Sequence, residues 1–259
     1  MTRAPTIELD DVSKTYGAAR ALDRVTLAVG AGEFVAIVGP SGSGKTTLLR
    51  LINRLAEPSS GRILVERQDV RLADPPVLRR RIGYVFQGVG LFPHLTVAEN
   101  VAITPRLLGW SRERRAARAD ELLELVRLDP ASYRDRFPAA LSGGERQRVG
   151  VARALAAEPK IVLMDEPFGA LDALNRDAIS RDYRALHDKL SLTTVMITHD
   201  LTEAVLLADR VVVVHAGRLI EEGTPQALMT SPQHEYVRAL IETPRRQAAR
   251  LGALLRDGA

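Results

Sequence analysis

Short runs of apolar and β-branched residues recur along the chain and predict the strands of a buried sheet. Five of these runs cover residues 34–38, 82–86, 161–165, 193–198 and 210–214. A strand whose successive residues are nearly all apolar is buried on both faces, which is typical of a parallel sheet covered by helices. We therefore predict an α/β core built on these five strands.

Residues 1–35 and 62–72 have a different pattern, in which short strand-like segments alternate with turns. The turns are expected at Gly17, at residues 30–32 and at residues 59–61. Several strands separated by glycine-containing turns favour antiparallel pairing. We expect these segments to form an antiparallel β lobe beside the core.

Helical spacing of apolar residues dominates the part of the chain between Gln87 and Pro159. It predicts helices over residues 97–103, 113–127 and 146–157. Because these helices interrupt the succession of core strands, we predict an α-helical subdomain inserted at about residues 88–159.

The last part of the chain, residues 232–259, is also helix-like. Its apolar positions are Leu240, Ile241, Leu251, Leu254 and Leu255. We expect residues 1–223 to form the main domain. Residues 224–259 are expected to be a C-terminal helical tail that docks or frays, with no regulatory domain after it.

Composition sets limits on the class of protein. Of the 259 residues 46% are hydrophobic, which is enough for one large buried core, and there is no cysteine for a disulfide or a thiolate metal site. No stretch approaches the roughly 18 uncharged apolar residues of a membrane span, and the start of the chain leads directly into a strand. We expect a soluble, cytosolic protein.

Charge gives a weak indication of nucleic-acid binding. The isoelectric point is about 9.7, but the formal net charge is only +4. The excess arginines are scattered, as at residues 79–81 and 112–118, and are expected to lie on solvated helix faces. We therefore expect no nucleic-acid partner.

A phosphate-binding loop is the first chemical motif. Residues 39–46 fit the spacing G-x-x-x-x-G-K-[ST], between an expected strand and an expected helix that begins near Thr47. Backbone N–H groups of such a loop point at phosphate oxygens, and the helix N-terminus adds to the attraction. Lys45 is expected to reach the β- and γ-phosphates, and the Thr46 hydroxyl to bind Mg²⁺. The expected nucleotide-binding residues here are Gly39, Pro40, Ser41, Gly42, Ser43, Gly44, Lys45, Thr46 and Thr47.

An acid pair follows the expected strand at residues 161–165. Ligands of open α/β sheets lie at the carboxyl ends of the strands, where Asp165 and Glu166 are placed. Asp165 is expected to hold Mg²⁺ through its water shell. Glu166 is expected to face the γ-phosphate and polarise the attacking water. The two motifs together indicate a P-loop NTPase core with the antiparallel β lobe and the inserted helical subdomain.

With these motifs, the chain resembles the ATP-binding-cassette ATPases from about Ile7 to about Gly223. The family signature stands at residues 141–145 as Leu-Ser-Gly-Gly-Glu, where the family often has Gln in place of Glu145. The resemblance implies that Ser142, Gly143 and Gly144 bind the ATP held by the loop of a second copy. A hydroxyl and free N–H groups ahead of a helix suit an anion.

The resemblance assigns four more residues, one at a time. Tyr16 matches the aromatic residue that stacks on adenine, and the antiparallel lobe would lie on the adenine side. Gln87 matches the glutamine that joins the Mg²⁺ site to the helical subdomain. Asp172 matches the acidic loop across the dimer interface, and His199 matches the switch histidine near the γ-phosphate. ATP and Mg²⁺ are thus the expected cofactors, and Glu166, His199 and Gln87 the expected catalytic residues.

The family also indicates what the ATPase drives. Zinc-finger or long coiled-coil insertions, typical of DNA-repair members, are absent from the sequence, and so are fused membrane helices, typical of exporters. A single cassette resembles an importer subunit. Residues 88–101, 106–110 and 133–138 look most like the importers of glycine betaine, choline and carnitine. Polyamine, amino-acid and sulfate importers share the same site residues and stay open, as does a DNA-maintenance ATPase.

The expected partners follow from this resemblance. The chain would pair with a second copy or a close paralogue when ATP is bound. It would contact integral membrane permease subunits, through the groove formed by residues 88–101, and serve a solute-binding protein indirectly. Its expected place is the cytoplasmic side of the membrane, as a peripheral subunit. The regulatory domain of many such importers has no room in this chain, so ionic-strength sensing by this subunit is in doubt.

Overall fold

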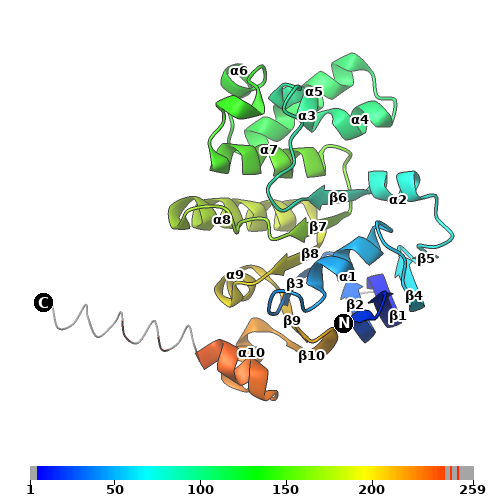
Figure 1. Ribbon diagram of the computed structural model, residues 1–259. Helices are drawn as coiled ribbons and strands as arrows, with labels where there is room; N and C mark the ends of the chain where they lie inside the picture. Colours follow the sequence, from blue (N-terminus) through cyan, green and yellow to red (C-terminus); the bar gives the residue numbers. More distant parts are fainter. Residues whose placement is uncertain (1–4, 243–245, 247–249, 251–259) are drawn as a thin grey trace, which may run out of the picture.

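A computed structural model describes residues 5–242, 246 and 250. Its central sheet has six strands in the order β10-β9-β3-β8-β7-β6 (Figure 1). These strands are β3 (Phe34–Val38), β6 (Ile82–Val85), β7 (Ile161–Asp165), β8 (Thr193–Thr198), β9 (Arg210–His215) and β10 (Arg218–Gly223). The five predicted core strands are confirmed and pair in parallel.

The sixth strand, β10, was not predicted. It pairs antiparallel with β9 through a turn at Ala216 and Gly217, whose φ angles are 48° and 79°. Two successive residues with positive φ are typical of the tight hairpin turn that matches the twist of its strands. A strand of polar composition, with Glu221 and Glu222 in it, carries little of the apolar signal by which the other five were found.

The position of β3 in the structure explains why its sequence is apolar throughout. Phe34, Ala36 and Val38 enter a core cluster with the helical subdomain, whereas Val35 and Ile37 enter a second cluster with the antiparallel sheet. All five side chains are at most 1% exposed. Successive residues of a strand point to opposite faces, so burial on both faces requires an apolar residue at each position.

The antiparallel lobe is confirmed, with longer strands than predicted. Its order is β2-β1-β4-β5. The bounds are β1 (Pro5–Tyr16), β2 (Ala19–Gly30), β4 (Ser60–Val65) and β5 (Gln68–Asp69). The prediction of short strands was wrong for β1 and β2, each of which has 12 residues. Register shifts between the two strands let a long ribbon bend over the core.

The helical segment lies on one side of the central sheet, at the top of Figure 1. It contains α3 (Val97–Val101), α4 (Ile103–Leu107), α5 (Arg112–Leu125), α6 (Pro130–Tyr133), a short 3₁₀ turn (Pro138–Ala140) and α7 (Gly143–Leu155). The predicted single helix at residues 97–103 was wrong, since Ala102 leaves helical geometry between α3 and α4. The α7 helix begins three residues earlier than predicted, because Ser142 and Glu145 cap it.

The remaining helices cover the sheet. They are α1 (Lys45–Ile52), α2 (Pro75–Arg81), α8 (Ala173–Leu190), α9 (Leu201–Leu207) and α10 (Pro225–Thr230). The first was predicted, the last lies in the helical tail predicted at residues 224–259, and the three between them were not predicted. The α1 helix begins at Lys45, two residues before the predicted start. Each loop residue from Gly39 to Gly44 therefore lies between the end of β3 and the first turn of α1.

Residues that follow β10 pack on the core. Leu228 of α10, and Val237 and Ile241 of the helical residues 235–242, are at most 3% exposed. Leu240 packs against the same cluster. The predicted apolar positions Leu251, Leu254 and Leu255 lie outside the described residues. Within the described part of the chain, no helix combines the length and apolar character needed to span a bilayer.

Candidate functional site

The phosphate-binding loop has a backbone that only glycine fits at two of its positions. A β-carbon on Gly39 would collide with the backbone oxygen of Val214 in β9. Gly44, at the start of α1, has a φ of 100°, and a β-carbon there would collide with the backbone oxygen of Ala21. These close approaches fix the loop against β9 and β2 and leave the α1 N-terminus for an anion.

Lys45 lies over this loop. Its Nζ donates hydrogen bonds to the carbonyl oxygens of Gly39 at 2.7 Å and of Pro40 at 2.9 Å. Burial lowers the pKa of Lys45, against the opposing charges of Glu166 and Asp165. Because both present acceptors are neutral, an anionic phosphate oxygen would be the stronger partner.

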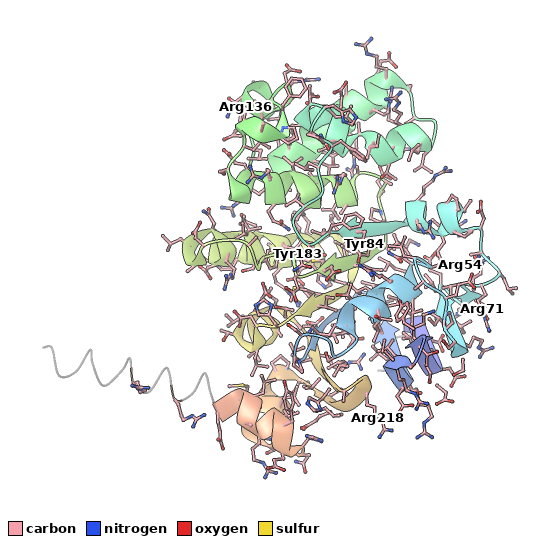
Figure 2. All side chains as sticks on the ribbon, in the orientation of Figure 1. Arg54, Arg71, Tyr84, Arg136, Tyr183 and Arg218 are labelled. Carbon is pink, nitrogen blue, oxygen red and sulfur yellow. The ribbon has the colours of Figure 1, made fainter. Side chains whose placement is uncertain are left out.

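Asp165 ends β7 beside the loop. The Thr46 hydroxyl donates to its Oδ1 at 3.3 Å, and the hydroxyl of Tyr84, labelled in Figure 2, donates to its Oδ2 at 3.5 Å. Asp165 is 7% exposed, and burial raises the pKa of its carboxyl group. A carboxylate and a hydroxyl are the hard oxygen donors that Mg²⁺ prefers, so Thr46 and Asp165 fit a magnesium site.

Glu166 is the meeting point of two polar side chains. His199 Nδ1 lies 3.2 Å from Glu166 Oε2, and Gln87 Nε2 donates to the same oxygen at 3.4 Å. Glu166 has a φ of 44°, which is uncommon for a residue other than glycine. Strain of this kind clusters at functional sites, which supports a functional role for Glu166.

One cleft of about 510 Å³ collects half of the expected site residues. It is lined by Ala21, Ser41, Gly42, Gly44, Lys45, Thr46, Thr47, Gln87, Glu166 and His199. A cation, a hydroxyl group and a hydrogen-bonded carboxylate thus face one space. Three other expected positions, Gly39, Pro40 and Asp165, contact its lining through the bonds of Lys45 and Thr46. Ser43, the remaining residue of the loop, donates its backbone N–H to Pro40 O.

The signature residues are not among those that line this cleft. Ser142 caps α7 in a reciprocal pair, since its Oγ accepts from Glu145 N and its N–H donates to Glu145 Oε2. Gly143 and Gly144 form the first turn of α7. The Tyr133 hydroxyl donates to Glu145 Oε1 at 2.5 Å and is the main reason that the pKa of Glu145 is lowered. This explains the Glu at position 145, because each carboxylate oxygen accepts one bond.

Asp172 lies next to the signature and away from the cleft lining. It caps α8 by accepting from the backbone and side-chain nitrogens of Asn175, and the first of these bonds lowers the pKa of Asp172. A β-carbon on Gly144 would lie 3.4 Å from Asn175 Oδ1, so the starts of α7 and α8 are in contact. Tyr16, 48% exposed at the end of β1, is also outside the cleft lining, with Lys14 Nζ 4.8 Å from its ring centroid.

A second, apolar groove of about 430 Å³ lies between the sheet and the helical segment. Leu55, Ile82, Phe86, Phe92 and Ile103 supply much of its surface. The sequence prediction placed residues 88–101 at such a groove and did not include the residues from α1 to β6. Phe92 is 42% exposed there.

Two buried polar residues near this groove escaped the sequence analysis. Asn100 accepts from Phe92 N at 2.8 Å and donates to the carbonyl oxygens of Phe92, Leu95 and Thr96. An asparagine between Val97 and Val101 on an apolar face was the available signal. Arg153 donates to the backbone oxygens of Val89 and Gly90 in the loop before Phe92. Its sequence context carried no such signal, because these partners are backbone carbonyls far away in the sequence.

Comparisons with known proteins agree with this geometry. Residues 22–169 match the model of the ABC transporter family. The chain is 49% identical over 236 residues to the glycine betaine/carnitine/choline transport ATP-binding protein OpuCA of Bacillus subtilis, which covers 91% of this chain and 62% of the relative. The chain thus spans about three fifths of that relative's length.

Two further matches bear on function. The sulfate/thiosulfate import ATP-binding protein CysA 2 of Agrobacterium fabrum is 46% identical over 233 residues, covering 89% of this chain and 67% of that protein. The solved dimeric structure of a post-hydrolysis state of the ATP-binding cassette MJ0796, bound to ADP and Pi, matches with a TM-score of 0.77 at 36% identity. It covers 85% of this chain and 98% of the solved chain. The predicted P-loop NTPase fold is therefore confirmed.

Proposed function

The chain belongs to the ABC transporter family, and on that premise we propose that it hydrolyses ATP to drive an importer. The observation that carries the proposal is the composition of the 510 Å³ cleft, where Lys45, Thr46 and Glu166 face one space. A phosphate-binding cation, a metal-binding hydroxyl and an oriented carboxylate are what phosphoryl transfer to water requires.

The proposed chemistry divides among the residues of the cleft. Lys45 and N–H groups of the loop between Gly39 and Thr47 hold the phosphates, apart from Pro40, which has no N–H, and Ser43, whose N–H donates to Pro40 O. Thr46 and Asp165, with Gln87 beside them, would hold Mg²⁺, which neutralises charge on the transferred phosphoryl group. Glu166 accepts the proton of the attacking water, and His199 and Gln87 orient its carboxylate through their bonds to Oε2.

The site is proposed to be completed by a second copy. Ser142, Gly143, Gly144 and Asp172 sit together at the starts of α7 and α8, outside the lining of the cleft that holds Lys45. A two-fold arrangement would place these N–H groups and the Ser142 hydroxyl on the γ-phosphate of the partner's nucleotide. The dimeric solved relative supports this arrangement. Tyr16 would stack on the adenine base from the exposed end of β1.

The transported solute is proposed to be a quaternary-amine osmoprotectant, namely glycine betaine, choline or carnitine. The resemblance to the transport protein named for those three solutes supports this choice. The apolar groove with Phe92 would receive a segment of a separate membrane permease, so the chain would lie at the cytoplasmic face of the membrane. An extracytoplasmic binding protein would deliver the solute. A sulfate importer is the second candidate, since the sulfate/thiosulfate relative is nearly as similar.

Uptake by a strain that lacks the gene for this chain tests the identity of the solute. The strain should lose uptake of labelled glycine betaine, choline or carnitine, and a plasmid copy should restore it. A copy with Asp165→Asn should not restore it, because the metal site is removed. Loss of labelled sulfate uptake, with normal uptake of all three amines, would replace the first candidate by the second.

A further inference from the structure

The loop after Gln87 has three successive residues in the left-handed region. The φ angles are 73° for Gly88, 67° for Val89 and 56° for Gly90. The two glycines adopt this conformation without cost, whereas a β-branched residue is a steric outlier there. By backbone geometry alone, position 89 should also be glycine. The valine side chain must therefore serve a contact that outweighs its backbone strain.

That contact is with α7. Val89 is 8% exposed, and a β-carbon on Gly150 would lie 2.7 Å from Val89 Cγ1. Real β-carbons essentially never approach another heavy atom so closely, so the missing side chain at position 150 makes the space that Val89 fills. Gly150 lies within the helix, where glycine is otherwise unfavourable. Two residues that are each locally unfavourable thus fit one another.

Arg153, on the next turn of α7, holds the backbone of the same loop. Its Nη2 donates to Val89 O at 2.5 Å and its Nη1 to Gly90 O at 2.7 Å. Arg153 is 8% exposed, its guanidinium lies 6.0 Å from the Phe86 ring centroid, and among the described residues no carboxylate forms an ion pair with it. Burial lowers the pKa of Arg153. A buried cation is costly unless its donors are satisfied, so the fork of two carbonyl bonds is a strong restraint on the loop.

We propose that Val89, Gly150 and Arg153 lock the loop to α7 and so position Gln87 against Glu166. The three are positioning residues, since none of them lines the cleft that contains Lys45. The lock joins Gln87 to the helix that begins at the signature. Arg153 and Gly90 also line the apolar groove beside Phe92, so a segment bound in the groove would act directly on the lock. This role rests on the proposed ATPase activity.

Arginine substitution tests the restraint. Arg153→Gln should lower kcat at least about fivefold, the size of a contact-network coupling, and leave the affinity for ATP unchanged. Hydrogen exchange at the amides of residues 88–90 should become faster. Arg118→Gln is the matched control, because Arg118 likewise donates to two successive carbonyls, of Leu155 and Ala156, at the far end of α7. The control should keep wild-type kcat and exchange.

A double-mutant cycle tests the contact between the side chains. Gly150→Ala should lower kcat at least about fivefold, but change it less than about twofold when Val89→Gly is already present. If Gly150→Ala does not fold, Val89→Gly in the same chain should restore folding. Equal losses in both backgrounds, no restoration, or unchanged kcat and exchange in Arg153→Gln would overturn the lock. A wild-type chain without ATPase activity would instead refute the proposed function.

Discussion

His199 Nδ1 lies 3.2 Å from Glu166 Oε2, and the Gln87 amide donates to the same oxygen from the end of the strand on the other side of β7. Glu166 follows β7, His199 follows β8, and Gln87 follows β6. Because parallel strands end at one edge of the sheet, three separate strand ends converge on one carboxylate. The other oxygen of Glu166 stays available to accept a proton from water.

Removing the carboxylate and removing the loop cation should have different effects. Glu166→Gln should keep ATP binding and lower turnover by about 10²–10⁴, the range for loss of a general base. Lys45→Ala should weaken binding itself, because a phosphate-facing cation is lost. Nucleotide titration together with steady-state ATPase rates separates the two. An equal loss of ATP affinity in both variants would contradict these roles.

Asp165→Asn should abolish hydrolysis and yet stabilise the nucleotide-free protein. Burial raises the pKa of Asp165 above its usual 3.8, so the folded state disfavours its ionised form. Asn keeps an oxygen for the Thr46 hydroxyl and its amide can donate to Tyr84. The free energy of unfolding at neutral pH should rise by roughly 1 kcal/mol, a common gain when a destabilising residue of a functional site is replaced.

The pH dependence of this stabilisation fixes its cause. Well below pH 3.8 the carboxyl group is neutral in both states, and burial of its charge contributes no difference in stability between wild type and variant. As pH rises through the raised pKa, the wild type loses stability relative to Asn, and the gap then levels off. Urea unfolding across this range measures it. A gap that is constant or closes with rising pH would exclude burial of the charge as the reason.

Phe92→Ala should uncouple transport from hydrolysis. Phe92 is half-exposed at the apolar groove and contributes nothing to the cleft lining. The isolated variant should therefore keep the ATPase rate of the wild type, and cells carrying it should fail to accumulate the solute. Leu72→Ala is the control, since Leu72 is 83% exposed and outside the groove lining. If both variants lost uptake equally, the groove would not be what couples ATP hydrolysis to transport.

Complementation between two inactive variants should reveal a shared site. Lys45→Ala damages the loop of one chain, and Ser142→Arg fills the signature of the other. In the mixed pair, one of the two sites joins an intact loop to an intact signature, so mixing should restore ATPase activity that neither variant has alone. The activity should follow the product of the two concentrations. No gain on mixing would indicate that each chain carries a self-sufficient site.

Local pattern was sufficient for the motifs and the core strands. The loop at residues 39–46 and the apolar strand before Asp165 could be read from the sequence because their chemistry depends on neighbouring residues. The break at Ala102 could not, since alanine is a strong helix former, and neither could the polar strand β10, which pairs with β9 through a tight turn. Arg153 was missed for a physical reason, because its partners are 63 and 64 residues away and are backbone oxygens.

The mass of the Glu166→Gln chain in solution, with and without ATP, tests most directly whether two copies close around nucleotide. Sedimentation without ATP should give the 28.3 kDa of one chain, and saturating ATP should double the mass. Adding Ser142→Arg to the same chain should keep it monomeric, because the long arginine side chain would fill the space at the start of α7 that the partner's γ-phosphate needs. A chain that stays monomeric at saturating ATP, or that dimerises equally well with Ser142→Arg, would contradict the account.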